Sequence, residues 1–170
     1  MKVSYRWLKK YVALDHEPAA IEQALTLLGL EVERVYEIGI PPLENVVVGE
    51  VLERNPHPNA DRLSVCVVDA GPDHGRKTIV CGAQNYKVGD RVPVALPGGV
   101  LSGGLKIKKS KLRGVTSDGM MCSGKEIGYD DDAEGLLVLS DQPDLGLGIN
   151  DVFPDNDVVF DIEVTPNRPD

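Results

Sequence analysis

The sequence predicts an α+β protein in which a five-stranded β-barrel is inserted in a small discontinuous α/β domain. Eighteen glycines and twelve prolines in 170 residues imply many turns, which favours short strands over long helices. Residues 1–41 carry helical spacing, whereas 42–150 carry repeated short apolar runs. An alternating run in 151–170 can return to the first part. We therefore expect a first domain in two pieces, 1–41 and 151–170, with the barrel between them.

The first piece reads as two helices followed by a strand. Ser4 caps a short amphipathic helix, in which Trp7 and Tyr11 recur at four-residue spacing. We expect both rings in the core, with a contact to another subunit as the alternative. Pro18 lies in the first turn of the second helix, where its missing N–H costs nothing, and Gly29 ends that helix.

The strand that follows has a candidate partner at the far end of the chain. Leu30 and Val32 alternate with polar residues, which is typical of a strand. The run 158–164, Val-Val-Phe-Asp-Ile-Glu-Val, alternates in the same way and can pair with it. Gly39-Ile-Pro-Pro marks a linker between the first piece and the barrel.

The barrel is predicted from five apolar runs of strand length. Turns rich in Pro, Gly and Asn separate these runs, which lie at 46–52, 63–68, 78–81, 91–96 and 136–139. Strands at this spacing suggest a small closed or partly open barrel, and the oligonucleotide-binding fold is the leading candidate.

The residues offer no catalytic or metal site. Cys66, Cys81 and Cys122 lie in apolar runs without Cys-x-x-Cys spacing, which favours small buried side chains over metal ligands or a nucleophile. His57 and Asp61 lie in a Pro-rich loop with no nucleophile beside them, so we interpret them as loop architecture.

No apolar run is long enough to span a membrane, and residues 1–12 lack the apolar core of a signal peptide. These absences predict a soluble, cytoplasmic protein.

Charge is distributed unevenly. The formal net charge is -9 for the whole chain, and it is -1 for 1–41, -3 for 42–150 and -5 for 151–170. An anionic partner would therefore have to be bound by the middle, where 105–113 holds five cations and no acid. Such a ridge attracts phosphate whatever the sign of the whole molecule. The alternative is a solvated strand and turn.

Two further segments offer polar groups to a nucleic acid. Arg62 stands at the mouth of a strand and can reach a phosphate. Gln84 and Asn85 end another strand, and their amides suit either base edges in RNA or closure of the turn.

Three separated motifs carry a resemblance. His57-Pro-Asn-Ala-Asp-Arg-Leu, Ile79-Val-Cys-Gly-Ala-Gln-Asn and Lys111-Leu-Arg-Gly-Val-Thr-Ser-Asp-Gly-Met-Met-Cys-Ser resemble the tRNA-binding barrel of endothelial-monocyte-activating-polypeptide-like proteins. The same barrel occurs in some methionyl-tRNA synthetases and in the beta subunit of bacterial phenylalanyl-tRNA synthetase. The run 1–12 resembles the start of that beta subunit, and 160–170 resembles the motif that follows its barrel.

The resemblance implies that this chain is the N-terminal fragment of such a beta subunit. The family enzyme is an alpha2-beta2 tetramer that attaches phenylalanine to its tRNA using ATP and magnesium. Its aminoacylation site lies in the alpha subunit and its editing site lies later in beta. The fragment should therefore hold no catalytic residue, metal or cofactor, and should act as an accessory tRNA-binding module.

The expected RNA-binding residues fall into two groups. The barrel face with the cationic ridge, and separately Arg62, should contact phosphates. Asn85, Ser117, Met121 and Ser123 match positions of the family motifs and should line an RNA-facing groove. The ridge itself consists of Lys106, Lys108, Lys109, Lys111 and Arg113.

Two other roles stay open at this point. The negative sum over 42–150 favours a structural or assembly domain of the same synthetase with little tRNA contact, because strong RNA binders are commonly basic. A stand-alone tRNA-binding chaperone is the remaining alternative.

Overall fold

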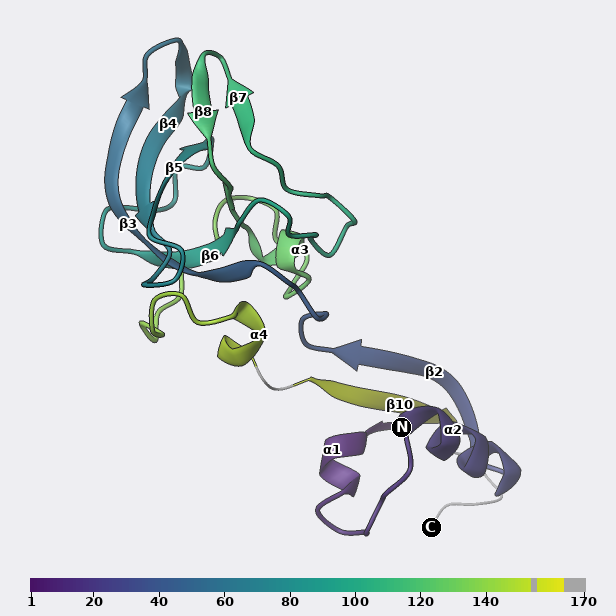
Figure 1. Ribbon diagram of the computed structural model, residues 1–170. Coiled ribbons are helices and arrows are strands. Elements are labelled where there is room, and N and C mark those ends of the chain that lie inside the picture. The colour runs from purple at the N-terminus through teal and green to yellow at the C-terminus, as the bar shows by residue number, and fades with distance from the viewer. Residues whose placement is uncertain (154–155, 164–170) are drawn as a thin grey trace. The chain divides into compact units, whose positions relative to one another are not determined.

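The computed structural model describes residues 1–153 and 156–163 (Figure 1). Antiparallel strands predominate, with a few short helices, and the chain forms two compact units. The smaller unit contains Met1–Gly39 and the late strand β10 (Asp157–Glu163), and the larger unit begins at Ile40 and contains every element from β3 to α4. The motif at 165–170 lies outside the described residues.

The smaller unit is built on a three-stranded antiparallel sheet. Its elements are β1 (Lys2–Ser4), α1 (Tyr5–Leu8), α2 (Pro18–Leu27), β2 (Glu31–Ile38) and β10. The strand order is β1-β10-β2, so the late strand pairs with the strand after Leu30, as expected. Phe160 of β10 is fully buried and, with Ile21 and Ile162, forms the core of this unit.

The helix signals of the sequence are confirmed in this unit. Ser4 Oγ accepts a hydrogen bond from Trp7 N at 3.0 Å, which caps α1. Pro18 occupies the first turn of α2, and Gly29 follows its end with φ +82°, a left-handed conformation that glycine adopts without strain.

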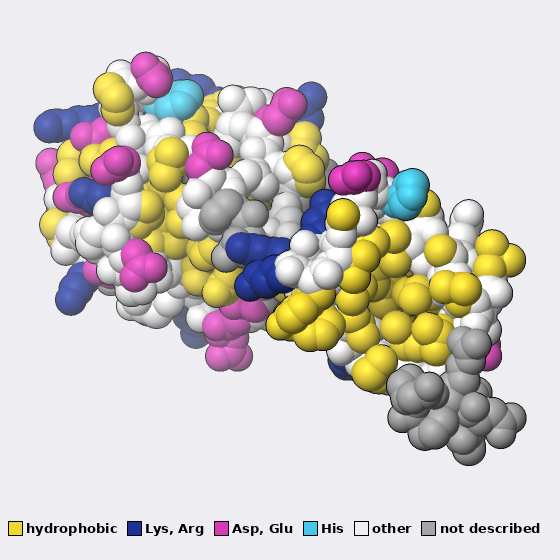
Figure 2. Space-filling model, turned by 90° about the horizontal axis from the view of Figure 1, so that it is seen from below, with side chains coloured by type: hydrophobic (Ala, Val, Ile, Leu, Met, Phe, Trp, Pro, Cys, Tyr) yellow, Lys and Arg dark blue, Asp and Glu magenta, His cyan; other side chains and the backbone are white. Residues whose placement is uncertain are grey.

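The expected burial of Trp7 and Tyr11 is wrong. Their exposed fractions are 50% and 70%, and their rings pack on one another with centroids 4.7 Å apart. The reason is that α1 ends at Leu8, so the four-residue spacing runs past the helix, and Tyr5 packs on the core instead. Figure 2 shows many hydrophobic side chains gathered over this smaller unit, in the right half of the view.

The larger unit contains a five-stranded antiparallel sheet in the order β5-β4-β3-β6-β9. Its strands are β3 (Val46–His57), β4 (Ala60–Asp69), β5 (Arg76–Cys81), β6 (Arg91–Ala95) and β9 (Met120–Met121). A separate hairpin joins β7 (Ser110–Leu112) to β8 (Val115–Ser117), and two short helices follow, α3 (Gly124–Ile127) and α4 (Ile149–Val152). The strand pairings of the described residues do not close into a ring, so a closed barrel is not shown.

Four of the five expected barrel strands are present, and the prediction of the fifth strand, at 136–139, is wrong. Residues 136–139 have no regular structure; β9 occupies the last place in the sheet. The burial of Leu136 and Leu139 explains the apolar run. The segment is held by single hydrogen bonds, such as the one from Leu139 N to Arg91 O at 2.8 Å, and not by the regular hydrogen bonds of a paired strand.

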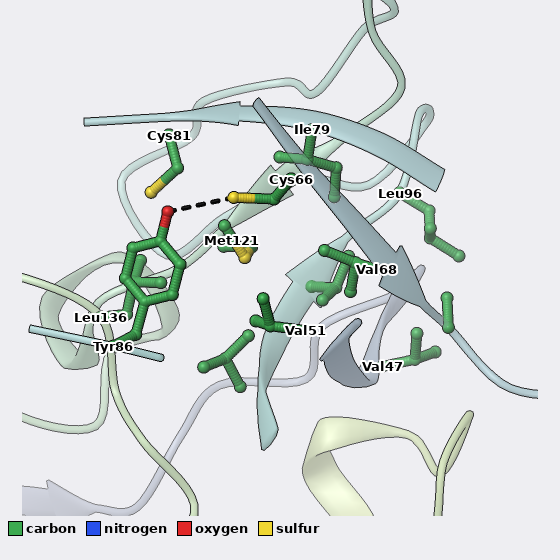
Figure 3. Close-up of a cluster of buried hydrophobic side chains, with 13 residues drawn as sticks. Val47, Val51, Cys66, Val68, Ile79, Cys81, Tyr86, Leu96, Met121 and Leu136 are labelled. Atoms are coloured by element: carbon green, nitrogen blue, oxygen red, sulfur yellow. Dashed lines mark hydrogen bonds between the residues drawn. The ribbon is translucent and has the colours of Figure 1, made fainter. Parts of the chain in front are cut away.

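The core of the larger unit lies on both faces of β3. Val47 and Val51 belong to one buried cluster, which is drawn in Figure 3, whereas Val46 and Val48 belong to another. A strand buried on both faces reads as a continuous apolar run because neither set of alternating side chains meets water. This explains the unbroken Val-Val-Val at the start of β3.

Candidate nucleic-acid interface

The hairpin of β7 and β8 presents part of the cationic ridge. Leu112 pairs with Val115, so only Arg113 and Gly114 form the turn, and their φ angles are +47° and +98°. Two consecutive positive φ angles are typical of a type I′ turn, whose twist matches that of the strands. Lys111 therefore lies on an exposed strand and Arg113 lies at the tip of the hairpin.

The turn between β3 and β4 holds the tip of this hairpin in place (Figure 1). Asn59 N donates to His57 Nδ1 at 3.0 Å, so the proton of the neutral ring lies on Nε2, which donates to Leu112 O at 3.1 Å. Asn59 Nδ2 donates to Arg113 O at 3.1 Å. His57 is 5% exposed, and its contacts are those of a structural bridge between two turns.

A pocket of about 620 Å³ opens next to the hairpin. Its walls come from the end of β5, the segment that leads into β7, the chain from β8 to α3, and the segment around Gly135. We call it the lysine pocket. Among its lining residues are Lys106, Lys108, Ser117, Met121, Ser123 and Glu126. Five of these six were expected from the sequence, so the fold brings half of the expected residues together.

A buried side chain fixes the two lysines of the pocket. Ile107, between them, is 5% exposed, and its backbone bonds to Gly98 and Gly99 on both sides. Because successive side chains of an extended segment point in opposite directions, Lys106 and Lys108 both point outward. Both are exposed, and among the described residues neither forms an ion pair.

One cation of the ridge is partly neutralised. Lys109 Nζ lies 2.8 Å from Asp118 Oδ1, and these side chains are 64% and 33% exposed. Lys106, Lys108, Lys111 and Arg113 have no such acidic partner among the described residues. The ridge therefore offers four uncompensated cations.

The two expected serines are structural members of the pocket wall. Ser117 Oγ accepts from Val80 N and donates to Gly119 O, both at 3.0 Å. Ser123 caps α3, and Glu126 Oε2 accepts from Ser123 N at 2.7 Å and from Ser123 Oγ at 3.0 Å. Both hydroxyls are buried, and these contacts set the shape of the wall.

Met121 and Asn85 differ in their relation to the lysine pocket. Met121 lies in the buried cluster of Figure 3 and also reaches the lysine pocket. Asn85 is not a lining residue: its Nδ2 donates to Leu136 O and its Oδ1 accepts from Leu136 N, both at 2.9 Å. The Asn85 amide is therefore engaged with the backbone of a segment 51 residues away, rather than with its own turn.

Arg62 is exposed on β4, outside the lining of the lysine pocket. Its backbone carbonyl is 3.5 Å from Gln84 Nε2. Sequence reasoning missed Glu126 as a pocket residue, although the signal was present: Ser123 followed three residues later by Glu126 is a capping-box pattern.

The cysteines have the surroundings of inert core residues. Cys66 Sγ and Tyr86 OH share a hydrogen bond at 3.1 Å within the buried cluster (Figure 3). Burial raises the pKa of the Cys66 and Cys81 thiols and raises the pKa of Cys122 to about 12. Thiols with raised pKa values are poor nucleophiles at neutral pH.

The part of the chain that the structure describes contains no cluster of three or more His, Cys, Asp or Glu side chains that could hold a metal ion. None of its helices has the length and hydropathy needed to cross a bilayer.

Comparison with known proteins shows which family this chain resembles. The family model described as a putative tRNA binding domain matches residues 46–147. The phenylalanine–tRNA ligase beta subunits of Syntrophus aciditrophicus and Geobacter metallireducens are each 48% identical to the chain, and that of Fusobacterium nucleatum is 44% identical. Each alignment covers 100% of this chain and 21% of the relative, so the chain spans about a fifth of the length of these curated relatives.

The fold and the site define a small antiparallel β domain with a cationic pocket. Because the family model covers more than half of the chain, the chain belongs to the putative tRNA binding domain family.

Proposed function

We propose that this chain is the N-terminal part of a phenylalanine–tRNA ligase beta subunit and serves it as an accessory tRNA-binding module. The observation that carries the proposal is the alignment of the entire chain, both units included, with beta subunits at 44–48% identity. The parent enzyme would join phenylalanine to its tRNA with ATP and magnesium, in the cytoplasm and together with an alpha subunit in an alpha2-beta2 tetramer. Catalysis would then belong to other parts of that enzyme.

The proposed RNA surface is the cationic ridge with the lysine pocket beside it. The four uncompensated cations would contact phosphates, because charge attraction and counterion release favour such contacts at exposed lysines and arginines. Arg62 would add a contact from β4. Ser117, Met121 and Ser123 would shape the pocket wall, and Asn85 would act indirectly by holding Leu136 in that wall.

We also propose that the larger unit is a barrel of the oligonucleotide-binding type, inserted in a domain formed by the smaller unit. Asp118 N donates to Thr78 O at 2.8 Å and Val80 N donates to Ser117 Oγ at 3.0 Å. These bonds connect β5 with the end of β8 and the residue that follows it, and they support a nearly closed arrangement of the sheet edges.

A structural or assembly role is the second candidate, and the net charge of -3 over 42–150 favours it. Binding of phenylalanine-accepting tRNA to two double variants separates the candidates. Lys106→Ala/Lys108→Ala removes two proposed phosphate contacts. Arg76→Ala/Lys87→Ala removes the same charge from exposed positions outside the ridge and the pocket.

If the ridge binds tRNA, Lys106→Ala/Lys108→Ala makes the slope of log affinity against log salt shallower by about 1.5, because each lost phosphate contact reduces that slope by about 0.7 to 0.9. The control variant Arg76→Ala/Lys87→Ala should change the slope far less. Equal losses in both variants, or an unchanged affinity in both, would reject the ridge as the RNA surface. Absence of tRNA binding even by the unmodified chain would favour the assembly role.

A further inference from the structure

The lysine pocket combines apolar walls with groups of opposite charge. Leu112, Met120 and Leu136 contribute apolar surface, while Lys106, Lys108 and Glu126 contribute charge. Its volume of about 620 Å³ lies in the range of roughly 300 to 1,000 Å³ that is typical of sites for single small ligands. A duplex cannot enter a space of this size, but one unstacked nucleotide can.

Glu126 is held with one carboxylate oxygen free. Both hydrogen bonds from Ser123 end on Oε2, and among the described residues Oε1 has no hydrogen-bond partner. The capping box therefore fixes the side chain, and Oε1 remains an acceptor available to a ligand.

The surroundings decide which end of a nucleotide would lie near Glu126. A neighbouring pocket shares Ser123 and Glu126 with the lysine pocket and is lined by Asp130 and Asp131. A phosphate would be repelled from this acidic side and attracted to Lys106 and Lys108. The base of a bound nucleotide would then face the apolar walls and Oε1 of Glu126.

We propose that the lysine pocket takes a single unstacked nucleotide of the bound RNA, and that Glu126 selects a base with an exocyclic amino group. The proposal rests on the proposed function, since it assumes that RNA reaches this surface. Adenine, cytosine and guanine each carry an N–H₂ group that can donate to Oε1. Uracil offers a single N–H between two carbonyl oxygens, which a carboxylate repels. Reading of unpaired bases by their edges is the usual mode of sequence-dependent RNA recognition.

The three methionines of the chain provide the probe. Met120 and Met121 line the lysine pocket, whereas Met1 lies in the smaller unit. The 170-residue chain, labelled with ¹³C at the methionine methyl groups, is titrated with AMP, CMP, GMP and UMP, and with ribose 5-phosphate as the ligand without a base. We expect saturable shifts of the Met120 and Met121 signals, no shift of Met1, and affinity about fivefold weaker for UMP, the factor typical of one hydrogen bond.

Two variants sharpen the test. Glu126→Gln keeps the capping box, because a glutamine oxygen can also accept from Ser123, but it can turn an N–H₂ donor toward the base. The preference should then shift toward UMP. Lys108→Ala should weaken all four nucleotides by a similar factor.

Equal affinities for the four nucleotides, or shifts that ribose 5-phosphate reproduces, would overturn the base selection. If tRNA binds the chain but no nucleotide moves Met120 or Met121, the pocket inference falls and the proposed function stands. If the nucleotides bind in the expected order but tRNA does not bind, the proposed function falls, and the pocket selects bases of free nucleotides and not of bound RNA.

Discussion

Removing one acidic side chain should strengthen RNA binding. Asp118 lies 2.8 Å from Lys109 and so cancels one cation of the ridge. Asp118→Asn keeps the side-chain oxygen and leaves untouched the backbone bond from Asp118 N to Thr78 O. Since the pair is largely exposed, its loss should change the free energy of unfolding by no more than about 1 kcal/mol.

The gain can be worked out from the charges. At roughly 0.8 per phosphate contact, the ridge contributes about -3.2 to the slope of log affinity against log salt through Lys106, Lys108, Lys111 and Arg113. A freed Lys109 would be the fifth contact of the ridge and would bring this contribution to about -4.0. Near 4 Å in water, one more pair of opposite charges is worth about 1 kcal/mol, or roughly a fivefold gain in affinity at low salt.

The assay is fluorescence anisotropy of labelled tRNA over a salt series, with Asp73→Asn as the matched control. Asp73 is exposed in the turn between β4 and β5, so the control makes the same change of net charge away from the ridge. If Asp118→Asn gains no more affinity than Asp73→Asn, a freed Lys109 does not contact phosphate and the reasoning is refuted.

Three predictions concern stability and reactivity. Phe160→Ala should destabilise the smaller unit by about 3 to 5 kcal/mol, because Phe160 is fully buried; hydrogen exchange of β2 amides measures this, and unchanged protection would contradict it. The buried thiols, including Cys122 with its pKa of about 12, should resist a thiol reagent near pH 8 until urea unfolds the chain, and rapid labelling of folded chain would be inconsistent with their burial. Burial alone raises the pKa of Asp157, but hydrogen bonds from Ser4 Oγ, Arg6 N and Val158 N outweigh it and lower that pKa below its ordinary 3.8. The stability that Asp157 contributes is therefore present above about pH 4 and is lost as the pH falls further. In urea unfolding, Asp157→Asn should therefore lower the free energy of unfolding less at about pH 3 than at about pH 7. An equal effect of the variant at both pH values would argue against this reasoning.

The strands with dense apolar runs could be predicted from the sequence. The runs at 46–52 and 63–68 mark β3 and β4 because both strands bury side chains against the sheet core. The alternation after position 157 also predicted the pairing of β10 with β2. In each of these cases the local pattern and the tertiary burial agree.

Buried segments that do not pair as strands could not be predicted in the same way. Leu136 and Leu139 are buried like strand residues, yet the side chain of Asn85 holds Leu136, and no local pattern reveals a partner 51 residues away. The β7–β8 hairpin has only a weak local signal, because Gly114 suits the turn but Arg113, with φ +47°, is not a residue that such turns prefer at the first position. Trp7 and Tyr11 were misjudged because periodicity does not say where a helix ends.

The candidate site was predicted unevenly. A cluster of lysines is visible in the sequence, and so Lys106 and Lys108 were found. Whether a polar side chain is free for a ligand often depends on tertiary contacts, so the sequence could not indicate that Ser117 is bonded to Val80 in the wall. The ion pair of Lys109 with Asp118 escaped notice because both residues read as ordinary surface charges.

The most direct test of the central claim is binding of phenylalanine-accepting tRNA to the unmodified chain between about 50 and 200 mM salt. The four contacts of the ridge alone predict an affinity that falls by roughly 80-fold over this range, and a contact from Arg62 would steepen the fall. An absence of binding at the lowest salt, or an affinity that does not change with salt, would contradict a tRNA-binding role for the cationic ridge and favour the assembly role.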